Sequence, residues 1–288
     1  NPELDTVDTV VHLASDHATV VLEAEQALFG ERREANGLAV ESDLTGVFEK
    51  AGRRTGFVGE GLPAQHQDVA GVPDTEPVPE DSPKYMGFRS GFGKSQATED
   101  AVTLGEQWGE FAGGTTQQVS HLHLDLERWY SQDRDDRVSK MFCPAHADER
   151  KVEGTGQNLG ASSGVGECPA TEETARKEGT VGHAQKARGA REKERPPLLR
   201  RDFDSTDPGR FDAEDAERAG VHFVSLQESV EDFVRVREAM NADGVVDNEE
   251  SEVGPRNENG ILQYVTTRKR GNYLVPPRQL RALPPASP

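Results

Sequence analysis

The stretch GVHFVSLQESVEDFVRVREAM, Gly220–Met240, sets the fold class of this chain. Its first seven residues are mostly apolar, which predicts a buried strand. The remainder is expected to form a helix, because Val230, Phe233 and Val234 recur at the spacing that places them on one helical face. A strand that leads directly into an amphipathic helix indicates a fold that mixes both kinds of element.

Further strands are expected on both sides of this stretch. The segment QVSHLHL, Gln118–Leu124, alternates apolar and polar residues as a half-buried strand does, and Leu126–Tyr130 continues it as a short helix. Two short strands are expected at Ile261–Thr267 and Asn272–Val275. The order of these elements predicts an α+β fold with antiparallel sheets, and not a regular repeat of parallel strand–helix units.

The N-terminal third contains a less regular version of the same pattern. Thr6–Ala14 and Gly37–Phe48 are expected to be strands, and a helix between them, about His17–Phe29, is expected to begin after Asp16. Over residues 52–114 this periodicity gives way to glycine, proline and acidic residues, which predicts a long loop or a domain boundary.

The charge balance narrows the range of partners. The 288 residues include 52 acidic and 33 basic ones, for a formal net charge of -19. Such a surface repels phosphate, so nucleic acid is not an expected partner. It also suits a salt-rich environment, where self-repulsion is screened, and we infer a halophilic source. No apolar run approaches the roughly 18 residues that a membrane span needs, so no span is expected.

Three groups of residues are candidate sites. His121 and His123 share one face of an expected strand, a spacing that some metal sites use, although a simple pair on the sheet surface is the plainer interpretation. Cys143 and Cys168 are too few for a four-thiolate zinc site, and whether they pair is open. The stretch VGHAQKARGAREKERPPLLRRDF, 181–203, concentrates cations around His183 in an acidic chain. It is either a solvated basic face or a functional site.

Several segments resemble, in their order along the chain, the dye-decolourising peroxidases, which are haem enzymes with two ferredoxin-like α+β domains. The C-terminal half carries GHAQKAR, LRRDF, GVHFVSL with its following helix, and GNYLVPP. Upstream, DTVVHLASDHATVVLEAEQALFG looks like the strand–helix unit of the family's first domain, and AGGTTQQVSHLHLDLERW looks like the start of the second. RRTGFVGEGLPA, Arg53–Ala64, is similar to the family's G-x-x-D-G segment. The order of the segments is the specific part of the resemblance.

The resemblance implies a two-part architecture of the dimeric α+β barrel type. It places an N-terminal ferredoxin-like part with a distal loop at residues 1–114, and a C-terminal ferredoxin-like haem-binding domain at residues 115–288. The first elements of the family's N-terminal domain would lie upstream of Asn1, so an incomplete N-terminal domain is expected. Localisation stays open between cytoplasmic and exported, and a homo-oligomer is compatible with the resemblance.

The resemblance also implies a haem site. His183 corresponds to the axial ligand of the iron, and Arg201 to the distal arginine, whose fixed charge stabilises bound peroxide. Glu60 corresponds to the acid–base aspartate of G-x-x-D-G, although it stands one residue late and is one methylene longer. A second alignment would place Ser90 there, which is not a base. Glu258 and Asn259 are candidates for the group that binds the other nitrogen of the proximal histidine.

The function implied is that of a haem b peroxidase that uses hydrogen peroxide to oxidise organic donors. Bulky donors would react at the surface through relay residues, for which Trp129 and Tyr130 are candidates. The alternative is a protein that binds or handles haem with little peroxidase turnover, because the distal segment departs from the family pattern. A third hypothesis is a structural α+β protein without a cofactor.

Overall fold

The computed structural model describes most of the chain in two compact units. The larger unit is formed by residues 1–5 and 54–275, and the smaller by residues 6–53 and 276–288. The expected boundary between residues 114 and 115 stays a prediction. The residues that the structure describes are 7–30, 34–35, 38–39, 44–59, 61–70, 72–88, 96–142, 181–189, 195–205, 219–241 and 260–281.

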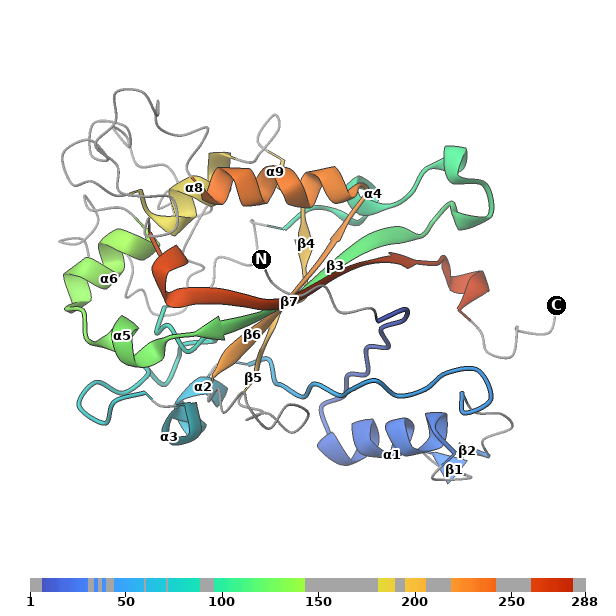
Figure 1. Ribbon diagram of the computed structural model, residues 1–288, viewed down its shortest axis with the longest axis horizontal. Coiled ribbons are helices and arrows are strands. Elements are labelled where there is room, and N and C mark those ends of the chain that lie inside the picture. The colour runs from blue at the N-terminus through green and yellow to red at the C-terminus, as the bar shows by residue number, and fades with distance from the viewer. Residues whose placement is uncertain are drawn as a thin grey trace. The chain divides into compact units, whose positions relative to one another are not determined.

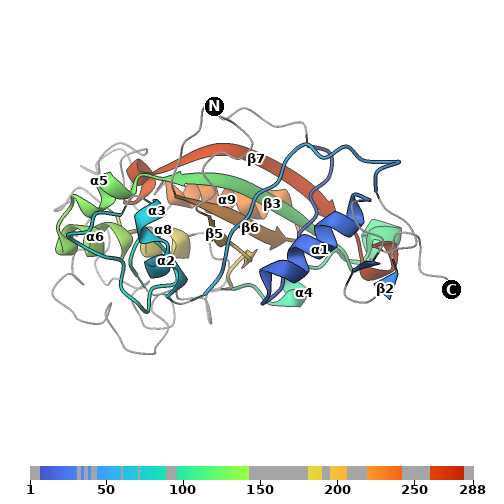
Figure 2. The same ribbon diagram turned by 90° about the horizontal axis from the view of Figure 1, so that it is seen from below.

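The larger unit is built on one antiparallel sheet. Its central strand β3 (Thr115–Leu124) pairs with β6 (Gly220–Gln227) on one side and β7 (Val265–Val275) on the other. Two short strands, β4 (Leu199–Arg200) and β5 (Phe203–Ser205), pair with the outer edge of β6. Figure 2 shows β7, β3 and β6 side by side as long curved ribbons.

This strand order identifies the sheet as ferredoxin-like. Along the chain, β3 is followed by helices, the short edge strands β4 and β5, then β6, α9 and β7. In the sheet the spatial order is β4-β6-β3-β7. If β4 and β5 are counted as the second strand, the first strand (β3) and the third (β6) lie at the centre of the sheet. The expected α+β class with an antiparallel, ferredoxin-like sheet is confirmed.

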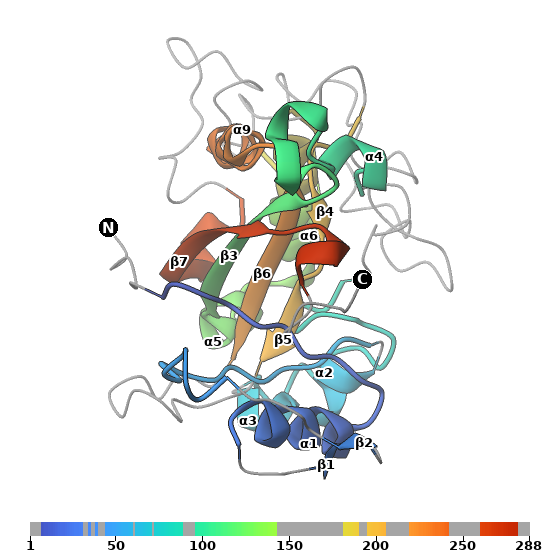
Figure 3. The ribbon, with the colours of Figure 1, turned by 90° about the vertical axis from the view of Figure 1, so that its right-hand side faces the viewer.

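The helix α9 covers one face of the sheet, as Figures 1 and 3 show. A capping box at Ser229 and Asp232 starts it, because each side chain binds a backbone N–H at the helix end. Helix α8 packs against α9 and is followed along the chain by β4. The helices of this region are α5 (Leu126–Tyr130), α6 (Arg134–Met141), α8 (His183–Gly189) and α9 (Val230–Met240).

The inward side of α9 differs from the expected one. Phe233 is buried beside Phe223, and Met240 is buried two turns further on. Val234, which was expected to share this face, is 43% exposed, so that part of the prediction is wrong. The position one turn after Phe233 is Arg237, a cation that the search for apolar periodicity passed over. The sheet face under α9 therefore receives charge as well as apolar side chains.

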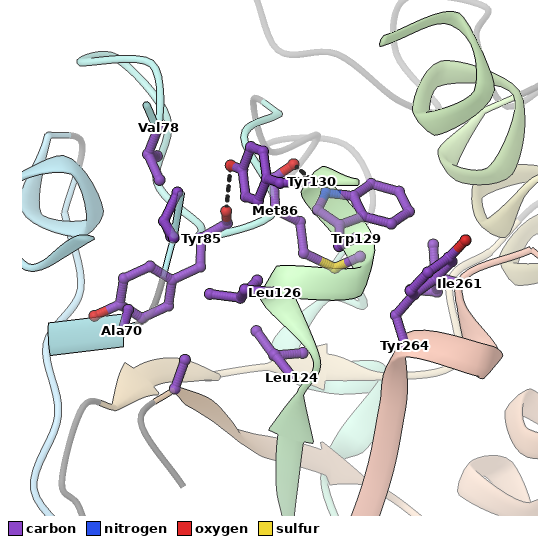
Figure 4. Close-up of a cluster of buried hydrophobic side chains, with 12 residues drawn as sticks. Ala70, Val78, Tyr85, Met86, Leu124, Leu126, Trp129, Tyr130, Ile261 and Tyr264 are labelled. Atoms are coloured by element: carbon purple, nitrogen blue, oxygen red, sulfur yellow. Dashed lines mark hydrogen bonds between the residues drawn. The ribbon is translucent and has the colours of Figure 1, made fainter. Parts of the chain in front are cut away.

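The apolar core lies where β3 runs into α5 (Figure 4). Trp129 and Tyr85 are fully buried there. The indole Nε1 of Trp129 donates to the carbonyl of Met86 at 3.0 Å, and the hydroxyl of Tyr130 donates to the carbonyl of Tyr85 at 2.6 Å. These bonds satisfy the polar atoms of two large buried rings, and they tie the segment around Tyr85 to α5.

The remaining elements are short. In the smaller unit, Glu25 on α1 forms ion pairs with Lys50 and Arg53. That unit also contains the 3-10 turn Arg278–Leu280. No described helix has both the length and the apolar character needed to cross a bilayer. The other helices, strands and 3-10 turns are α1 (Ala18–Leu28), β1 (Glu34–Ala35), β2 (Leu38–Ala39), α2 (Leu62–Gln65), α3 (Gln67–Ala70), α4 (Glu99–Val102), Glu106–Phe111 and Leu262–Tyr264.

Four expected strands differ from the structure. Residues 7–14 form no strand, and within 37–48 the described residues form only β2. A β-branched sequence forms a stable strand only beside a partner, and among the described residues none pairs with 7–14. The two short C-terminal strands are one continuous strand, β7, because an irregularity opposite His121 and Leu122 preserves the pairing with β3.

Candidate functional site

His183 stands at the first position of α8. Gly182 precedes it, and a Cβ at that position would overlap the backbone carbonyl of Phe142. Only glycine therefore allows the start of α8 to approach the end of α6 this closely. The next residue, Ala184, packs on the small apolar cluster of Val138 and Phe142. The Gly-His pair thus fixes where the imidazole lies.

The imidazole of His183 lies among cations. Burial, followed by the charges of Lys186, Arg200 and Arg237, lowers the pKa of His183 to about 3. The ring is therefore neutral throughout the physiological pH range. Its Nδ1 atom is buried and has no hydrogen-bond partner among the residues that the structure describes. A buried ring nitrogen without a partner costs free energy, and a bound ligand is one way to satisfy it.

The cations that act on His183 come from three separate elements, α8, β4 and α9. Lys186 on α8 is fully buried, and burial, followed by the charge of Arg237, lowers its pKa to about 7. Burial also lowers the pKa of Arg237 on α9 and of Arg270 on β7, and the charge of Arg237 adds to the effect at Arg270. Several cations that each lower the pKa of a neighbour form a region of positive potential inside an acidic protein.

The sheet surface beneath this region is polar. Gln118, Ser120, Ser225 and Gln227 are all buried, and alternation places them on the face that carries Phe223 and α9. The guanidinium of Arg270 donates to Ser120 Oγ at 3.2 Å. The helix-covered face therefore holds a polar and cationic layer where an ordinary core would be apolar.

The structure separates the two arginines of LRRDF. Arg200 lies opposite Ser225, on the polar face, and its charge reaches His183. Arg201 is exposed, and its guanidinium donates to the carbonyl of Arg200 at 2.9 Å. Of the two, only Arg200 is brought together with His183. Strand alternation could have found it, because neighbouring residues of a strand point to opposite faces.

Two carboxylates follow Arg200 along the same edge. The ammonium of Lys84 lies 3.2 Å from Asp202 Oδ2 and 3.6 Å from Asp204 Oδ1. The pKa of Asp204 is raised to about 7, because burial and the charge of Asp202, which raise it, outweigh Lys84, which lowers it. Sequence reasoning missed this cluster, because its members are 118 and 120 positions apart from Lys84 in the chain.

Several predicted residues lie outside the described residues. They include the acid–base candidate Glu60, its alternative Ser90 and the proximal partners Glu258 and Asn259. The cysteines Cys143 and Cys168 lie outside them as well. The roles assigned to these residues remain predictions.

The paired histidines lie on the opposite face of the sheet from α9. His121 stacks on His222 of β6 with 4.8 Å between ring centroids, and Phe203 lies at the same distance from His222. Among the residues the structure describes, no group of three histidines, cysteines or acidic residues is placed to hold a metal ion. The rings of His121, His222 and Phe203 pack on one another on this face.

The two residues considered as surface relays are buried. Trp129 is 0% exposed and Tyr130 is 6% exposed, and both belong to the core of Figure 4. Burial raises the pKa of Tyr130 above its usual range. Neither side chain is exposed enough for a bulky donor to contact it, and a relay role for the two residues remains a prediction.

The strand order and the site together define a class of protein. It is an α+β protein with a ferredoxin-like sheet, whose helix-covered face carries a histidine set among cations. The model of the DUF7405 family, a family of unknown function, matches residues 1–277, and the chain belongs to that family. No curated protein matches the chain.

Solved structures of low identity are also similar to this chain. A dye-decolorizing peroxidase from Bacteroides thetaiotaomicron VPI-5482 is 14% identical, with a TM-score of 0.44 over 68% of this chain and 51% of that one. DyPB from Rhodococcus jostii RHA1 is 15% identical, with a TM-score of 0.46 over 70% and 54%. The chain spans about half the length of these proteins. The evidence for the fold is the strand order itself.

Proposed function

We propose that the protein binds haem b through His183 and uses hydrogen peroxide to oxidise organic donors. The observation that carries this proposal is the buried Nδ1 atom of His183, which has no partner among the described residues and lies in a region of positive charge. The order of segments along the sequence, which resembles the dye-decolourising peroxidases, supports the same assignment.

The residues of the site fit haem in two respects. A neutral imidazole can bind iron through one ring nitrogen and offer the other to a hydrogen-bonding partner, and the Nδ1 atom of His183 has no such bond among the described residues. The cations Lys186 and Arg237 suit the two carboxylates that haem b carries, because opposite charges offset the cost of burying both. When bound, haem would supply an iron centre that accepts peroxide and transfers electrons.

The chain's own residues have separate tasks in this proposal. His183 holds the cofactor from α8, and Gly182 fixes the position of that helix start. A guanidinium on the facing strand stabilises the negative charge that develops on a peroxide oxygen. The resemblance gives this role to Arg201, while the register of the strand supports Arg200. Glu60 is the acid–base group that the resemblance implies.

The matched pair Arg200→Met and Arg201→Met tests the proposal. Peroxide-dependent oxidation of a small phenolic donor would be measured after reconstitution with haem. We expect Arg200→Met to lower kcat/KM by about 10²- to 10³-fold, the usual loss of one charge-stabilising group, and Arg201→Met to lower it by less than about threefold. The reverse order would restore the role of Arg201. No turnover in the wild type would contradict peroxidase function.

A second candidate function is haem binding or handling with little turnover. The exposed guanidinium of Arg201 and the displaced position of Glu60 in its motif favour this alternative. Steady-state peroxide consumption separates the two functions. Clear activity in the wild type that is lost in Glu60→Gln would reject the second function, whereas haem binding with no activity in either protein would support it.

A further inference from the structure

The edge of the sheet beside Arg200 carries a buried carboxylate pair. β4 and β5 share one register against β6, since Arg200 lies opposite Ser225 and Phe203 opposite His222, and Arg201 between them donates its N–H to Val224. Alternation therefore places Asp202 and Asp204 on the same side as Arg200, with about 6.6 Å between successive residues of the set. Asp202 is therefore the next side chain after Arg200 on this side of the sheet, and Asp204 follows it.

The pair carries more negative charge than its partner offsets. Asp202 is 9% exposed and Asp204 is 1% exposed. Among the described residues Lys84 is their ion-pair partner, and Asp202 Oδ1 and both oxygens of Asp204 accept no hydrogen bond. Two buried carboxylates beside one ammonium leave one uncompensated charge, which is costly in a medium of low dielectric constant. A single bound proton removes that cost.

We propose that Asp202 and Asp204 together hold one proton beside Lys84 and are the proton-holding group of the site that His183 and Arg200 define. The second part of this statement rests on the proposed function. The raised pKa of Asp204, which follows from burial and from the charge of Asp202, agrees with it. A group that holds its proton near neutral pH is suited to acid–base work at that pH.

Among the described residues, Lys84 is the titratable group that contacts the pair. Phe57 forms a bridge to Asp204 through backbone bonds of 2.9 and 3.1 Å, and its ring lies against His66 and Tyr85. From β6 the residue opposite Asp204 is Val221, while His222 lies on the other face. The charged or titratable neighbours are therefore Lys84, Arg200, His66 and Tyr85, of which Lys84 contacts the carboxylates.

The role is restricted to moving a proton. Reduction of one hydrogen peroxide to two waters takes two electrons and two protons. The organic donor supplies the electrons and the protons. Cleavage of the O–O bond also needs a proton taken from one peroxide oxygen and delivered to the other, which leaves as water. The carboxylate pair would accept and return that proton in place of Glu60, to which the resemblance gives this role, and is unchanged after a turnover.

The shared proton is tested first in the haem-free protein, by following aspartate carboxyl carbons with ¹³C NMR as pH is varied. We expect one carboxyl of the wild type to titrate near neutral pH. Asp202→Asn should move that midpoint down, because a like charge is removed, and Lys84→Met should move it up, each by about one pH unit. Asp135→Asn, at an exposed carboxylate of α6, is the matched control and should leave it unchanged.

The same variants test the role in turnover through the pH profile of peroxide consumption after reconstitution with haem. The break in the profile should move down in Asp202→Asn and up in Lys84→Met, as the NMR midpoints do. Aspartates that all titrate in the acid range overturn the shared proton, even where haem binds normally. A profile that does not follow the NMR midpoints overturns the role. Failure to bind haem overturns the proposed function and leaves the NMR result standing.

Discussion

At the scale of single residues, the protein places charge where most folds place hydrocarbon. Lys186 is fully buried and Asp204 nearly so. The pKa of Lys186 is lowered to about 7, and that of Asp204 is raised to about 7. Burial is the main cause of both pKa shifts. It disfavours the charged form, so it lowers the pKa of a lysine and raises that of an aspartate. Such groups lower stability in the absence of a ligand, and residues of this kind gather at functional sites.

Asp204 predicts how stability depends on pH. Its folded pKa is raised to about 7, above the value of roughly 3.9 for an unfolded chain, so the stabilisation is complete below about pH 4 and is lost as pH rises through 7. Asp204→Asn, which is always neutral, should therefore have a higher free energy of unfolding than the wild type at pH 8 and a similar one at pH 4. Urea unfolding at both pH values measures this. An equal difference in unfolding free energy between Asp204→Asn and the wild type at pH 4 and at pH 8 would contradict this prediction.

At the scale of elements, the segments with strong periodicity were predictable from sequence. β3, β6 and α9 were anticipated because apolar residues recur in them with the correct period. The absence of a strand at residues 7–14 was not anticipated, because a β-branched segment forms a strand only beside a partner, and a single sequence does not reveal that partner.

The candidate site was predictable only in part. His183 was identified through its resemblance to a known segment, whereas Arg237 was hidden within an apolar pattern. The contact of Lys84 with Asp202 joins residues far apart in the chain, which no local pattern shows. Choosing Arg200 over Arg201 required the register of β4 against β6.

The start of α8 supports a prediction about a helix terminus. Gly182→Ala would place a methyl group against the backbone carbonyl of Phe142, and backbone cannot yield as a flexible side chain does. We expect a loss of about 1–3 kcal/mol in the free energy of unfolding, together with weaker haem binding. Gly52→Ala is the control, because the added methyl meets nothing within 4 Å. Equal effects of the two substitutions would show that the packing of α8 on α6 is unimportant.

At the scale of the whole molecule, the net charge of -19 governs behaviour in salt. Mutual repulsion of surface carboxylates opposes the compact state, and salt screens it over a Debye length that falls from about 10 Å at 0.1 M to about 3 Å at 1 M. We therefore expect Tm to rise by several degrees when KCl is raised from 0.1 to 1 M. A Tm that falls or does not change would contradict the inference of a halophilic protein.

The central claim is that one imidazole on α8 binds the iron of haem. Its most direct test is a titration of the haem-free protein with haem, followed by absorption spectroscopy, for the wild type, His183→Ala and the control His17→Ala at the exposed start of α1. We predict a spectrum of histidine-ligated haem in the wild type and in His17→Ala, and its loss in His183→Ala. Identical spectra and affinities for the wild type and His183→Ala would contradict the claim.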